Sequence, residues 1–547
     1  MKFKIFFTLF CLFSFSANLV RAEFSILREP NAVYLTPPAP AFSDAERQTE
    51  LAARRSKVFA AMNDKSVLIL MSAAPKIYTG DVDFLYRQEN NLYYLTNLKQ
   101  PEATLVLIKD GATVKEILFV PRPDPARETW NGKMYSFNEA ARISGVKTVL
   151  DALEFKGFLQ SIKDKKAFGS ADESVSIQAT SENLYFLLPD DDGDSDGLRE
   201  FGRERNVAGG ISGYKIKNAQ TIFADLRQVK SPFEQKLLQH AIDITTEAQE
   251  RAMATAKQSK WEYETQAEIE YIFRKRNADY WGYPSIVGCG ANSTTLHYIE
   301  SQSAVKPGDL LLMDVGAEYE HLTADVTRTF PVSGKFTREQ AEIYQIVYDA
   351  QEAAAKRIKP GAFFYEPSNA AKKTLEEGLY KLGLITGVGA LIPGTEHEVP
   401  DGKGGAKIVG TPQYTWWFMH GWGHWLGMNV HDVGDYAAVL QEGMIFTNEP
   451  GIYIREDALD YIPDTPANKA FLAKIRPAFE KYKNIGVRIE DDMLVTKTGV
   501  EWMTKALPRS IADIEAFMAK SPKEIRAKGS VKSLNHQLAF SINHLKP

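Results

Sequence analysis

The chain has 547 residues, a formal net charge of −5, 44% hydrophobic residues and 25% charged residues. This composition is ordinary for a soluble globular protein and leaves room for about two to four domains. The small negative charge argues against a general attraction to nucleic acid, so we expect no nucleic-acid partner.

Residues 1–22 have the three-part pattern of a secretory signal peptide. Lys2 and Lys4 precede an apolar run over residues 5–15, and Val20-Arg21-Ala22 offers small residues at the positions that a signal peptidase reads. A membrane anchor is the alternative, but the run is too short to cross ~30 Å of hydrocarbon as a helix. We therefore predict cleavage after Ala22, export to the periplasm or the medium, and no stable membrane insertion.

Cleavage at that point also removes one of the two cysteines, Cys11, and leaves only Cys289. Because a single thiol cannot form an intramolecular disulfide, the exported chain must be stabilised by its core alone.

Residues 23–228 are predicted to form an N-terminal α/β domain. A proline- and alanine-rich arm over residues 23–44 leads into a helical pattern over 45–62. Strand-like apolar runs follow at 66–71, 91–95, 104–108 and 116–120. Because helical stretches separate these runs, the pattern favours an α/β arrangement.

Residues 189–213 are predicted to be poorly ordered. Counted from Asp192, the acidic stretch matches the first half of a calcium-binding loop, but Arg203 stands where a glutamate should ligate the ion. An arginine opposes a cation, so we interpret this stretch as a solvated acidic loop.

Residues 229–512 are predicted to form a C-terminal domain. It begins at Ser231-Pro232-Phe233-Glu234, a capping box with proline at the first helical position, and the helical pattern runs to about Lys257. Further helices are predicted at 264–277, from Thr337 to about Ile358, and from Pro367 onward. Antiparallel strands with helices on one side make an α+β architecture. Residues 513–547 are expected to form one short helix and a polar tail.

Two aspartates lie next to apolar runs in this domain. Asp314 ends the run that begins at Leu310, and Asp325 precedes the run that ends at Phe330. A hairpin between the runs would bring both carboxylates to one face, where they repel each other unless a cation lies between them. A pair of solvated acids at the hairpin end is the alternative.

Histidines and glutamates follow in a fixed order. Three of the nine histidines, His420, His424 and His431, fall among glycines that allow close backbone approach. Any one of them could be a satisfied core residue, but the group favours a site.

Glu449 then stands before a proline-glycine turn, and Glu490 lies two residues after Arg488 in a strand-like run. Period-two geometry would place Arg488 and Glu490 on one face and pair their charges, and a surface salt bridge is the alternative reading. The whole order of two aspartates, a histidine and two glutamates is an oxygen-rich ligand set, which suits two divalent ions such as Mn²⁺, Co²⁺ or Fe²⁺ and also admits Zn²⁺.

These motifs resemble those of the Xaa-Pro aminopeptidases (aminopeptidase P) in the pita-bread metallopeptidase superfamily, which also contains prolidases, methionine aminopeptidases and the metal-free creatinases. The resemblance covers about residues 50–510, including the N-terminal motifs at 87–90, 93–96, 101–103 and 120–125. It implies a C-terminal pita-bread catalytic domain preceded by an α/β N-terminal domain.

The resemblance implies that Asp314, Asp325, His424, Glu449 and Glu490 ligate two divalent ions, with Asp325 and Glu490 bridging them. Mn²⁺ is the favoured metal. Asp314 would also receive the free amine of the substrate, and Glu449 would be the general base.

Other residues are implied to complete the site. His431 would stabilise the tetrahedral intermediate or protonate the leaving proline nitrogen, and His297 and His420 would line the proline pocket. Tyr453 and Arg488 would support them. Besides the general base, the candidate catalytic residues are therefore His431, His297, His420 and Arg488, and the same four with Tyr453 are the candidate substrate-binding residues.

The predicted function is removal of the N-terminal residue from peptides with proline at position 2. A prolidase restricted to dipeptides is the alternative, because the metal motifs do not separate the two. A metal-free creatinase-like hydrolase or a non-enzymatic binding protein is a third reading, which the presence of all five ligand residues disfavours. Neither Gly-x-Ser-x-Gly nor His-Glu-x-x-His occurs, which argues against a serine peptidase and a zincin.

A homodimer or homotetramer is also expected.

Three features depart from the family pattern. The segments 387–413 and 457–483 are longer than expected and are predicted to flank the cleft. Asn448 stands where an aliphatic residue is common, beside Glu449, and could alter the groups that support the ligands.

Overall fold

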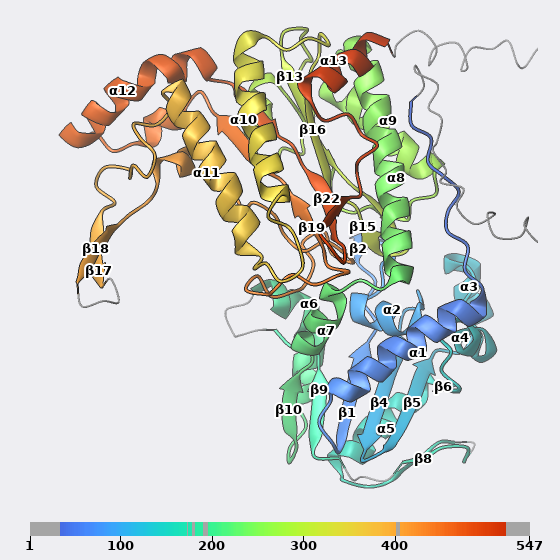
Figure 1. The fold of residues 1–547 in the computed structure, drawn as a ribbon. Coiled ribbons are helices and arrows are strands. Elements are labelled where there is room, and N and C mark those ends of the chain that lie inside the picture. The colour runs from blue at the N-terminus through green and yellow to red at the C-terminus, as the bar shows by residue number, and fades with distance from the viewer. Residues whose placement is uncertain (1–32, 172, 178–180, 190–194, 401–404, 521–547) are drawn as a thin grey trace, which may run out of the picture.

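The computed structural model describes residues 33–520 except 172, 178–180, 190–194 and 401–404. Two domains follow each other along the chain, with the N-terminal domain below the C-terminal domain in Figure 1. The predicted signal peptide and the tail beyond residue 520 lie outside the described residues.

A six-stranded mixed sheet is the centre of the N-terminal domain, in the order β10-β9-β1-β4-β5-β6. Its strands are β1 (Ser66–Met71), β4 (Thr104–Asp110), β5 (Thr113–Val120), β6 (Thr148–Asp151), β9 (Asn183–Phe186) and β10 (Lys215–Asn218). Along β1, Leu68 and Leu70 pack into one apolar cluster, and Val67 and Ile69 into another. Because successive strand residues point to opposite faces, this alternation shows that both faces of the sheet are buried.

Helices cover the sheet on both sides, and the predicted α/β arrangement is confirmed. They are α1 (Asp44–Ala61), α2 (Asn90–Thr96), α3 (Pro125–Asn131), α4 (Phe137–Ser144), α5 (Phe155–Lys163), α6 (Ser195–Gly209) and α7 (Gln220–Gln228). Residues of α1, α2 and α4 pack in the cluster that contains Leu68, and Phe158 of α5 packs in the other.

The strand predicted at 91–95 is wrong, because these residues belong to helix α2. The carboxylate of Glu89 caps the helix by accepting hydrogen bonds from the amides of Asn91 and Leu92 at 2.9 and 2.7 Å. Every residue of α2 is buried. A short, fully buried apolar run has no periodicity that would distinguish a helix from a strand.

The poor order predicted for 189–213 is also wrong over residues 195–209, which form α6. Arg203 donates a hydrogen bond to the Ser72 carbonyl at 2.6 Å and pairs with Glu204. Its guanidinium is therefore occupied within the fold. The acidic residues 190–194 of the suggested calcium loop lie outside the described residues.

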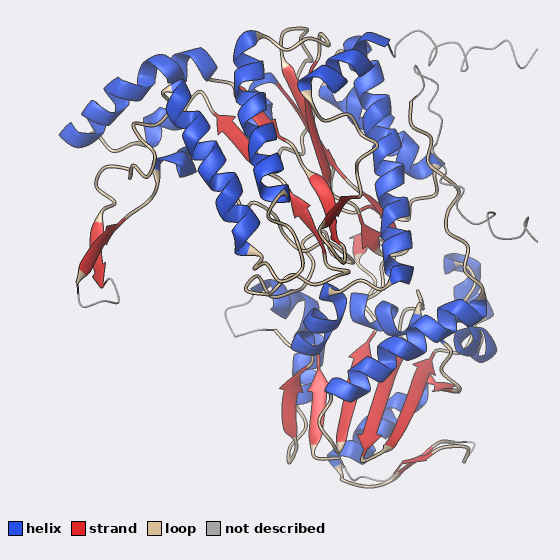
Figure 2. Ribbon diagram, viewed as in Figure 1, coloured by secondary structure: helices blue, strands red, loops and turns tan. Residues whose placement is uncertain are grey.

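The C-terminal domain places helices along one side of antiparallel strands, which confirms the predicted α+β architecture (Figures 1 and 2). Its helices are α8 (Pro232–Thr255), α9 (Glu262–Lys275), α10 (Arg338–Ala355), α11 (Tyr365–Leu382), α12 (Pro466–Tyr482) and α13 (Ile511–Lys520). Its central strands are β12 (Ile286–Cys289), β13 (Leu310–Val315), β16 (Val326–Pro331), β19 (Ile445–Asn448), β20 (Gly451–Ile454), β21 (Ile485–Arg488), β22 (Asp491–Val495) and β23 (Val500–Trp502).

The described part of the predicted arm is extended and docks on helix α8. The backbone amide of Tyr34 donates to Glu250 at 2.6 Å, and the amide and hydroxyl of Thr36 donate to Glu247 at 2.8 and 2.6 Å. Because both glutamates are buried, the arm supplies donors that their carboxylates need.

The two segments that are predicted to be longer than the family pattern form separate additions to the C-terminal domain. Residues 387–413 contain a hairpin of β17 (His397–Pro400) and β18 (Ala406–Val409), which projects sideways from the body in Figure 1. Residues 457–483 contain α12, which is anchored on α10 where the Tyr482 hydroxyl donates to Glu342 at 2.5 Å. No helix in the described ranges is long and apolar enough to cross a membrane.

Candidate metal centre and active site

The two aspartates meet where a hairpin closes. Strands β13 and β16 are antiparallel, with Asp314 opposite Thr327 and Val315 opposite Val326, so Asp325 comes just before the paired region. The hydroxyl of Tyr283 lies 2.6 Å from Oδ1 of both Asp314 and Asp325. The hairpin therefore brings both carboxylates to one buried point.

Three of the other side chains gather around Asp325. One ligand atom from each of Asp325, His424 and Glu490 lies within 4.8 Å of the others, and all three residues are buried. Nε2 of His424 lies 3.2 Å from Asp325 Oδ2 and 3.4 Å from Glu449 Oε1. Asp314 joins the group through its shared contact with Tyr283.

The imidazole of His424 is oriented as a metal ligand requires. Its Nδ1 lies 3.0 Å from the Trp425 carbonyl, which accepts a hydrogen bond only if Nδ1 carries a proton. Nε2 is thereby directed at the carboxylates, the arrangement commonly seen in metal-ligating histidines. A Cβ at Gly423 would collide with the Thr447 carbonyl, so glycine allows this close approach of the two segments.

The electrostatics of the metal-free cluster show that it is short of positive charge. Burial, together with the negative charges of Asp325 and Asp314, raises the pKa of Glu449 to about 7. Burial and the charges of Asp325 and Glu449 raise the pKa of Glu490 well above its usual value. Burial opposes a charged His424, but the hydrogen bond to Asp325 and the charge of Glu449 outweigh it and raise its pKa to about 9. Protons are therefore held where divalent cations would compensate the same charge.

Arg488 is paired with Asp314, and the expectation that its charge is committed to Glu490 is wrong. Its Nη2 lies 2.5 Å from Asp314 Oδ2, while Glu490 accepts a hydrogen bond from Thr327 at 2.6 Å. Across the described residues no ion pair joins Arg488 to Glu490. The reason is that Glu490 lies between β21 and β22, where the strand is interrupted and the period of two does not hold.

A chain of hydrogen bonds extends from Arg488 to His420. Nη1 of Arg488 donates to the Tyr453 hydroxyl at 2.8 Å, which lies 2.8 Å from Nε2 of His420. Nδ1 of His420 donates to the Gly421 carbonyl at 2.7 Å. Burial, and then the charge of Arg488, lowers the pKa of His420 to about 3. The imidazole is thus neutral, and its 3.5 Å contact with Glu449 is not an ion pair.

The remaining predicted residues lie at the edge of this cluster. The ring of His431 is 4.1 Å from the ring of His424, centroid to centroid. His297 is exposed on the loop after the 3₁₀ helix Gly290–Thr294. It is close enough to His420 to contribute to the lowered pKa of that residue, although burial and Arg488 have larger effects.

Sequence reasoning missed three hydroxyl groups that hold the ligands. Tyr283 links the two aspartates, Thr327 donates to Glu490, and Thr447 donates to Glu449 at 3.1 Å. A search for carboxylates and imidazoles passes over hydroxyls, and the available signal is the position of Thr327, two residues after Asp325, and of Thr447, two residues before Glu449.

Asn448 has a definite structural role beside Glu449. It is fully buried, its Oδ1 accepts a hydrogen bond from the Trp422 indole at 2.7 Å, and its Nδ2 donates to the Gln351 carbonyl at 3.0 Å. Asn448 therefore connects the histidine segment to helix α10.

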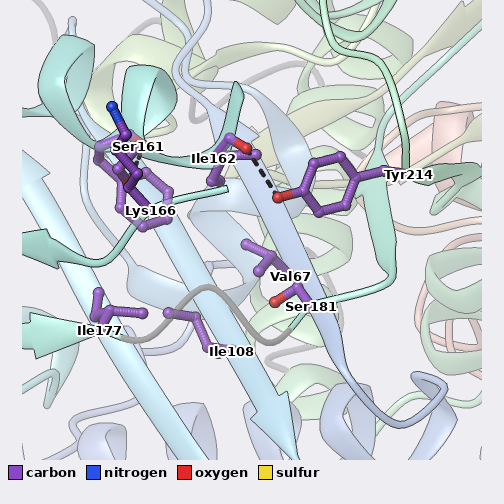
Figure 3. A pocket seen from close by; sticks show the side chains of 9 residues that line it. Val67, Ile108, Ser161, Ile162, Lys166, Ile177, Ser181 and Tyr214 are labelled. Carbon is purple, nitrogen blue, oxygen red and sulfur yellow. Dashed lines mark hydrogen bonds between the residues drawn. The ribbon is translucent and has the colours of Figure 1, made fainter. Parts of the chain in front are cut away.

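A separate hollow in the N-terminal domain lies away from these residues (Figure 3). Its lining is mostly apolar, and the Tyr214 hydroxyl donates to the Ile162 carbonyl at 2.8 Å. Because its described lining includes no carboxylate, histidine or cysteine, the hollow has no ligand set comparable to that of the C-terminal domain.

The pKa shifts predict how metal binding depends on pH. Folding raises the pKa of Glu449 from 4.5 to about 7 and that of His424 from 6.5 to about 9. The stability that these two groups contribute without metal is therefore present at low pH and lost as the pH rises through those values. Metal competes with the same protons, so the increase in Tm on adding Mn²⁺ should be larger at pH 8.5 than at pH 6.5.

Thermal unfolding at each pH, once with Mn²⁺ and once with a chelator, gives the increase in Tm due to the metal. Titration of groups that do not contact the metal affects both measurements equally and so drops out of this increase. An equal or smaller increase at pH 8.5 would contradict the assignment of the cluster as a metal site.

The Tyr283 contact predicts a second effect on metal affinity. Tyr283→Phe removes the hydroxyl that orients both aspartates, so metal affinity should fall about 10- to 100-fold, as is typical for groups that support ligands. Tyr344→Phe is the matched control, because its buried hydroxyl donates to the Arg509 carbonyl and touches no ligand. Chelator competition measures both variants, and equal affinities would rule out this role for Tyr283.

Comparison with known proteins places this geometry in a family. Residues 51–168 match the model of the aminopeptidase P N-terminal domain, and residues 236–497 match that of metallopeptidase family M24. The Xaa-Pro aminopeptidase of Haemophilus influenzae is 34% identical over 475 residues, which cover 86% of this chain and 97% of that protein. The Escherichia coli enzyme of the same name is 32% identical and covers 88% of this chain and 100% of its own length.

Solved structures of similar fold point to the same family as the sequence comparisons. Proline aminopeptidase P II from Yersinia pestis matches with a TM-score of 0.71 at 29% identity, covering 86% of this chain and 99% of that one. Escherichia coli aminopeptidase P with the inhibitor Pro-Leu matches with a TM-score of 0.70 at 30% identity, covering 88% and 99%. The chain is therefore a member of the M24 metallopeptidases and belongs to their Xaa-Pro aminopeptidase (aminopeptidase P) family.

Proposed function

We propose that this enzyme hydrolyses the bond between the N-terminal residue and a proline at position 2, with Asp314, Asp325, His424, Glu449 and Glu490 as ligands of two divalent ions. The observation that carries the proposal is the buried carboxylate cluster with Nε2 of His424 directed at it. When bound, the ions supply Lewis-acid chemistry, which polarises a carbonyl and lowers the pKa of water. We propose Mn²⁺ as the native metal, with Co²⁺, Fe²⁺ and Zn²⁺ as alternatives that metal analysis of the purified protein would distinguish.

Glu449 is the proposed general base. The pKa of about 7 belongs to the metal-free cluster; with two cations bound the carboxylate is ionised and can take a proton from water. The Thr447 hydroxyl fixes one carboxylate oxygen, Oε1, which leaves Oε2 to accept a proton from the attacking water.

The other residues have complementary roles in the proposal. Arg488 contacts Oδ2 of Asp314 and Tyr283 contacts Oδ1, so the aspartate is held in a fixed orientation in which it would receive the substrate amine. Burial lowers the pKa of His431, so its neutral imidazole can donate one hydrogen bond to the oxygen that becomes negative during hydrolysis. Neutral His420 and exposed His297 would line the proline pocket.

Substitution separates the base from the bridging ligand. Glu449→Gln should keep both metals and lose about 10²- to 10⁴-fold in kcat, because an amide offers an oxygen ligand but cannot take a proton. Asp325→Asn should lose metal first, because a bridging ligand needs its full charge. Elemental analysis and kcat of both variants test this: a Glu449→Gln enzyme that is fully active with metal bound would exclude Glu449 as the base, and two ions retained by Asp325→Asn would exclude the bridge.

Peptide length separates an aminopeptidase from a prolidase. A dipeptidase must recognise the proline carboxylate, which takes a fixed cation near the pocket. Arg488, the cation nearest the cluster, is already paired with Asp314. We therefore expect kcat/KM for Ala-Pro-Ala and Ala-Pro-Ala-Ala-Ala to exceed that for Ala-Pro. If kcat/KM is highest for the dipeptide and falls with length, prolidase is the correct function.

Export and self-association complete the proposal. The pattern over residues 1–22 supports removal of a signal peptide, so N-terminal sequencing of the native protein should begin at Glu23. An intact Met1 chain as the main active form would contradict export. Light scattering during size exclusion should give the mass of a dimer or tetramer, and a monomer mass would contradict self-association.

A further inference from the structure

The position of His431 depends on the backbone that carries it. Within the described part of the chain its imidazole makes no hydrogen bond or ion pair, and its ring contact is with His424. Because no hydrogen bond of its own orients the imidazole, it can face the metal cluster only if the backbone of its loop is fixed. Residues 427–432, here called the His431 loop, are fixed from two directions.

The first anchor is a buried ion pair next to His431. Asp432 accepts hydrogen bonds from Arg227 at 2.5 Å and from Lys230 at 3.2 Å, and all three side chains are at most 3% exposed. The Asp432 amide also donates to the Trp425 carbonyl at 2.8 Å. A Cβ at Gly427 would collide with the Asp432 carboxylate, so the loop folds tightly around this anchor.

The second anchor comes from the N-terminal domain. Nη2 of Arg87 donates to the Met428 carbonyl at 2.7 Å, while its Nε donates to Glu318 at 2.8 Å. The side-chain amide of Asn90, the first residue of α2, donates to Asn429 Oδ1. In Figure 1, α2 lies on the side of the N-terminal domain that faces the C-terminal domain.

The two anchors are connected to each other. Nη1 of Arg227 donates to Asn91 Oδ1 at 2.9 Å, so the guanidinium that holds Asp432 also contacts α2. The amide of Asn429 lies 3.3 Å from Asp432 Oδ1, so the residue contacted by Asn90 is also tied to Asp432. The N-terminal domain thus reaches the His431 loop through a continuous set of polar contacts, of which those of Arg227, Lys230 and Asp432 are buried and those of Arg87 and Asn429 are part-buried.

We propose that Arg87 and Asn90 are positioning residues for His431, and that the N-terminal domain thereby takes part in catalysis by the C-terminal domain. The proposal rests on the function proposed for His431. A displacement of about 1 Å in a group that acts on the transition state can cost about 10²-fold in rate. Loss of the anchor should therefore lower kcat and leave KM little changed.

A second interdomain ion pair provides a matched control. Arg47 on α1 forms two hydrogen bonds with Glu320, at 2.7 and 2.8 Å, and does not touch the His431 loop. Arg47→Ala therefore weakens the contact between the domains without releasing the loop. Arg87→Ala removes a comparable ion pair together with the loop contact.

The experiment measures kcat and KM with Ala-Pro-Ala for Arg87→Ala, Arg47→Ala and His431→Ala, and for Arg87→Ala combined with His431→Ala. Arg87→Ala should lower kcat about 10- to 100-fold, and Arg47→Ala should not. In the His431→Ala background Arg87→Ala should cost nothing further, because groups that act as a unit are not additive. Asn429→Ala, which removes the Asn90 contact without altering either charge pair, should show a smaller loss of the same kind.

Hydrogen exchange of the amides of residues 427–432 provides a readout that does not depend on turnover. Exchange should be faster in Arg87→Ala than in wild type and unchanged in Arg47→Ala. Unchanged exchange or unchanged kcat in Arg87→Ala, equal losses in both arginine variants, or full additivity with His431→Ala would each overturn the proposal. A wild-type enzyme with no activity on Ala-Pro-Ala would overturn the proposed function, and exchange would still decide whether Arg87 holds the loop.

Discussion

Four carboxylates gathered in one cluster are the constraint on which the rest of the site depends. Asp314, Asp325, Glu449 and Glu490 all lose most of their hydration, and this burial raises the pKa of Asp314, Glu449 and Glu490, while for Asp325 burial is outweighed by contacts led by the hydrogen bond to His424, which lower the pKa. Among those of residues 33–520 that the structure describes, the permanent positive charge in direct contact with them is that of Arg488. Two divalent cations would compensate the remaining negative charge, which explains why the metal-free cluster retains protons on Glu449 and His424.

The outer helices support this cluster as well as covering the strands. Gln351 on α10 donates to the carbonyls of Asn448 and Ile489, the residues that come just before the two glutamates proposed as ligands, at 2.9 and 3.2 Å. Arg328, fully buried, donates to the Glu490 carbonyl at 2.8 Å and pairs with Asp491 at 2.6 Å. The backbone around each glutamate is therefore fixed by buried polar contacts, as preorganised ligands require.

Much of this arrangement could be predicted from the sequence, because burial restricts what aspartate and histidine can do. A hairpin brings Asp314, beside its apolar run, next to Asp325, and two buried carboxylates side by side need a cation between them. The partner of Arg488 could not be predicted, because it depends on the break between β21 and β22. Tyr283 could not be found either, since a tyrosine near apolar residues has the pattern of an ordinary core residue. Helix α2 was taken for a strand because its residues are buried on every side.

We propose that the carboxylates form a two-cation site whose ions share Asp325 and Glu490. Anomalous diffraction from crystals of the Mn²⁺-loaded enzyme, recorded on both sides of the manganese absorption edge, tests it most directly. The account predicts two anomalous peaks about 3.5–4 Å apart, both in contact with Asp325 and Glu490. A single peak in a fully active enzyme, or peaks away from these two carboxylates, would contradict it.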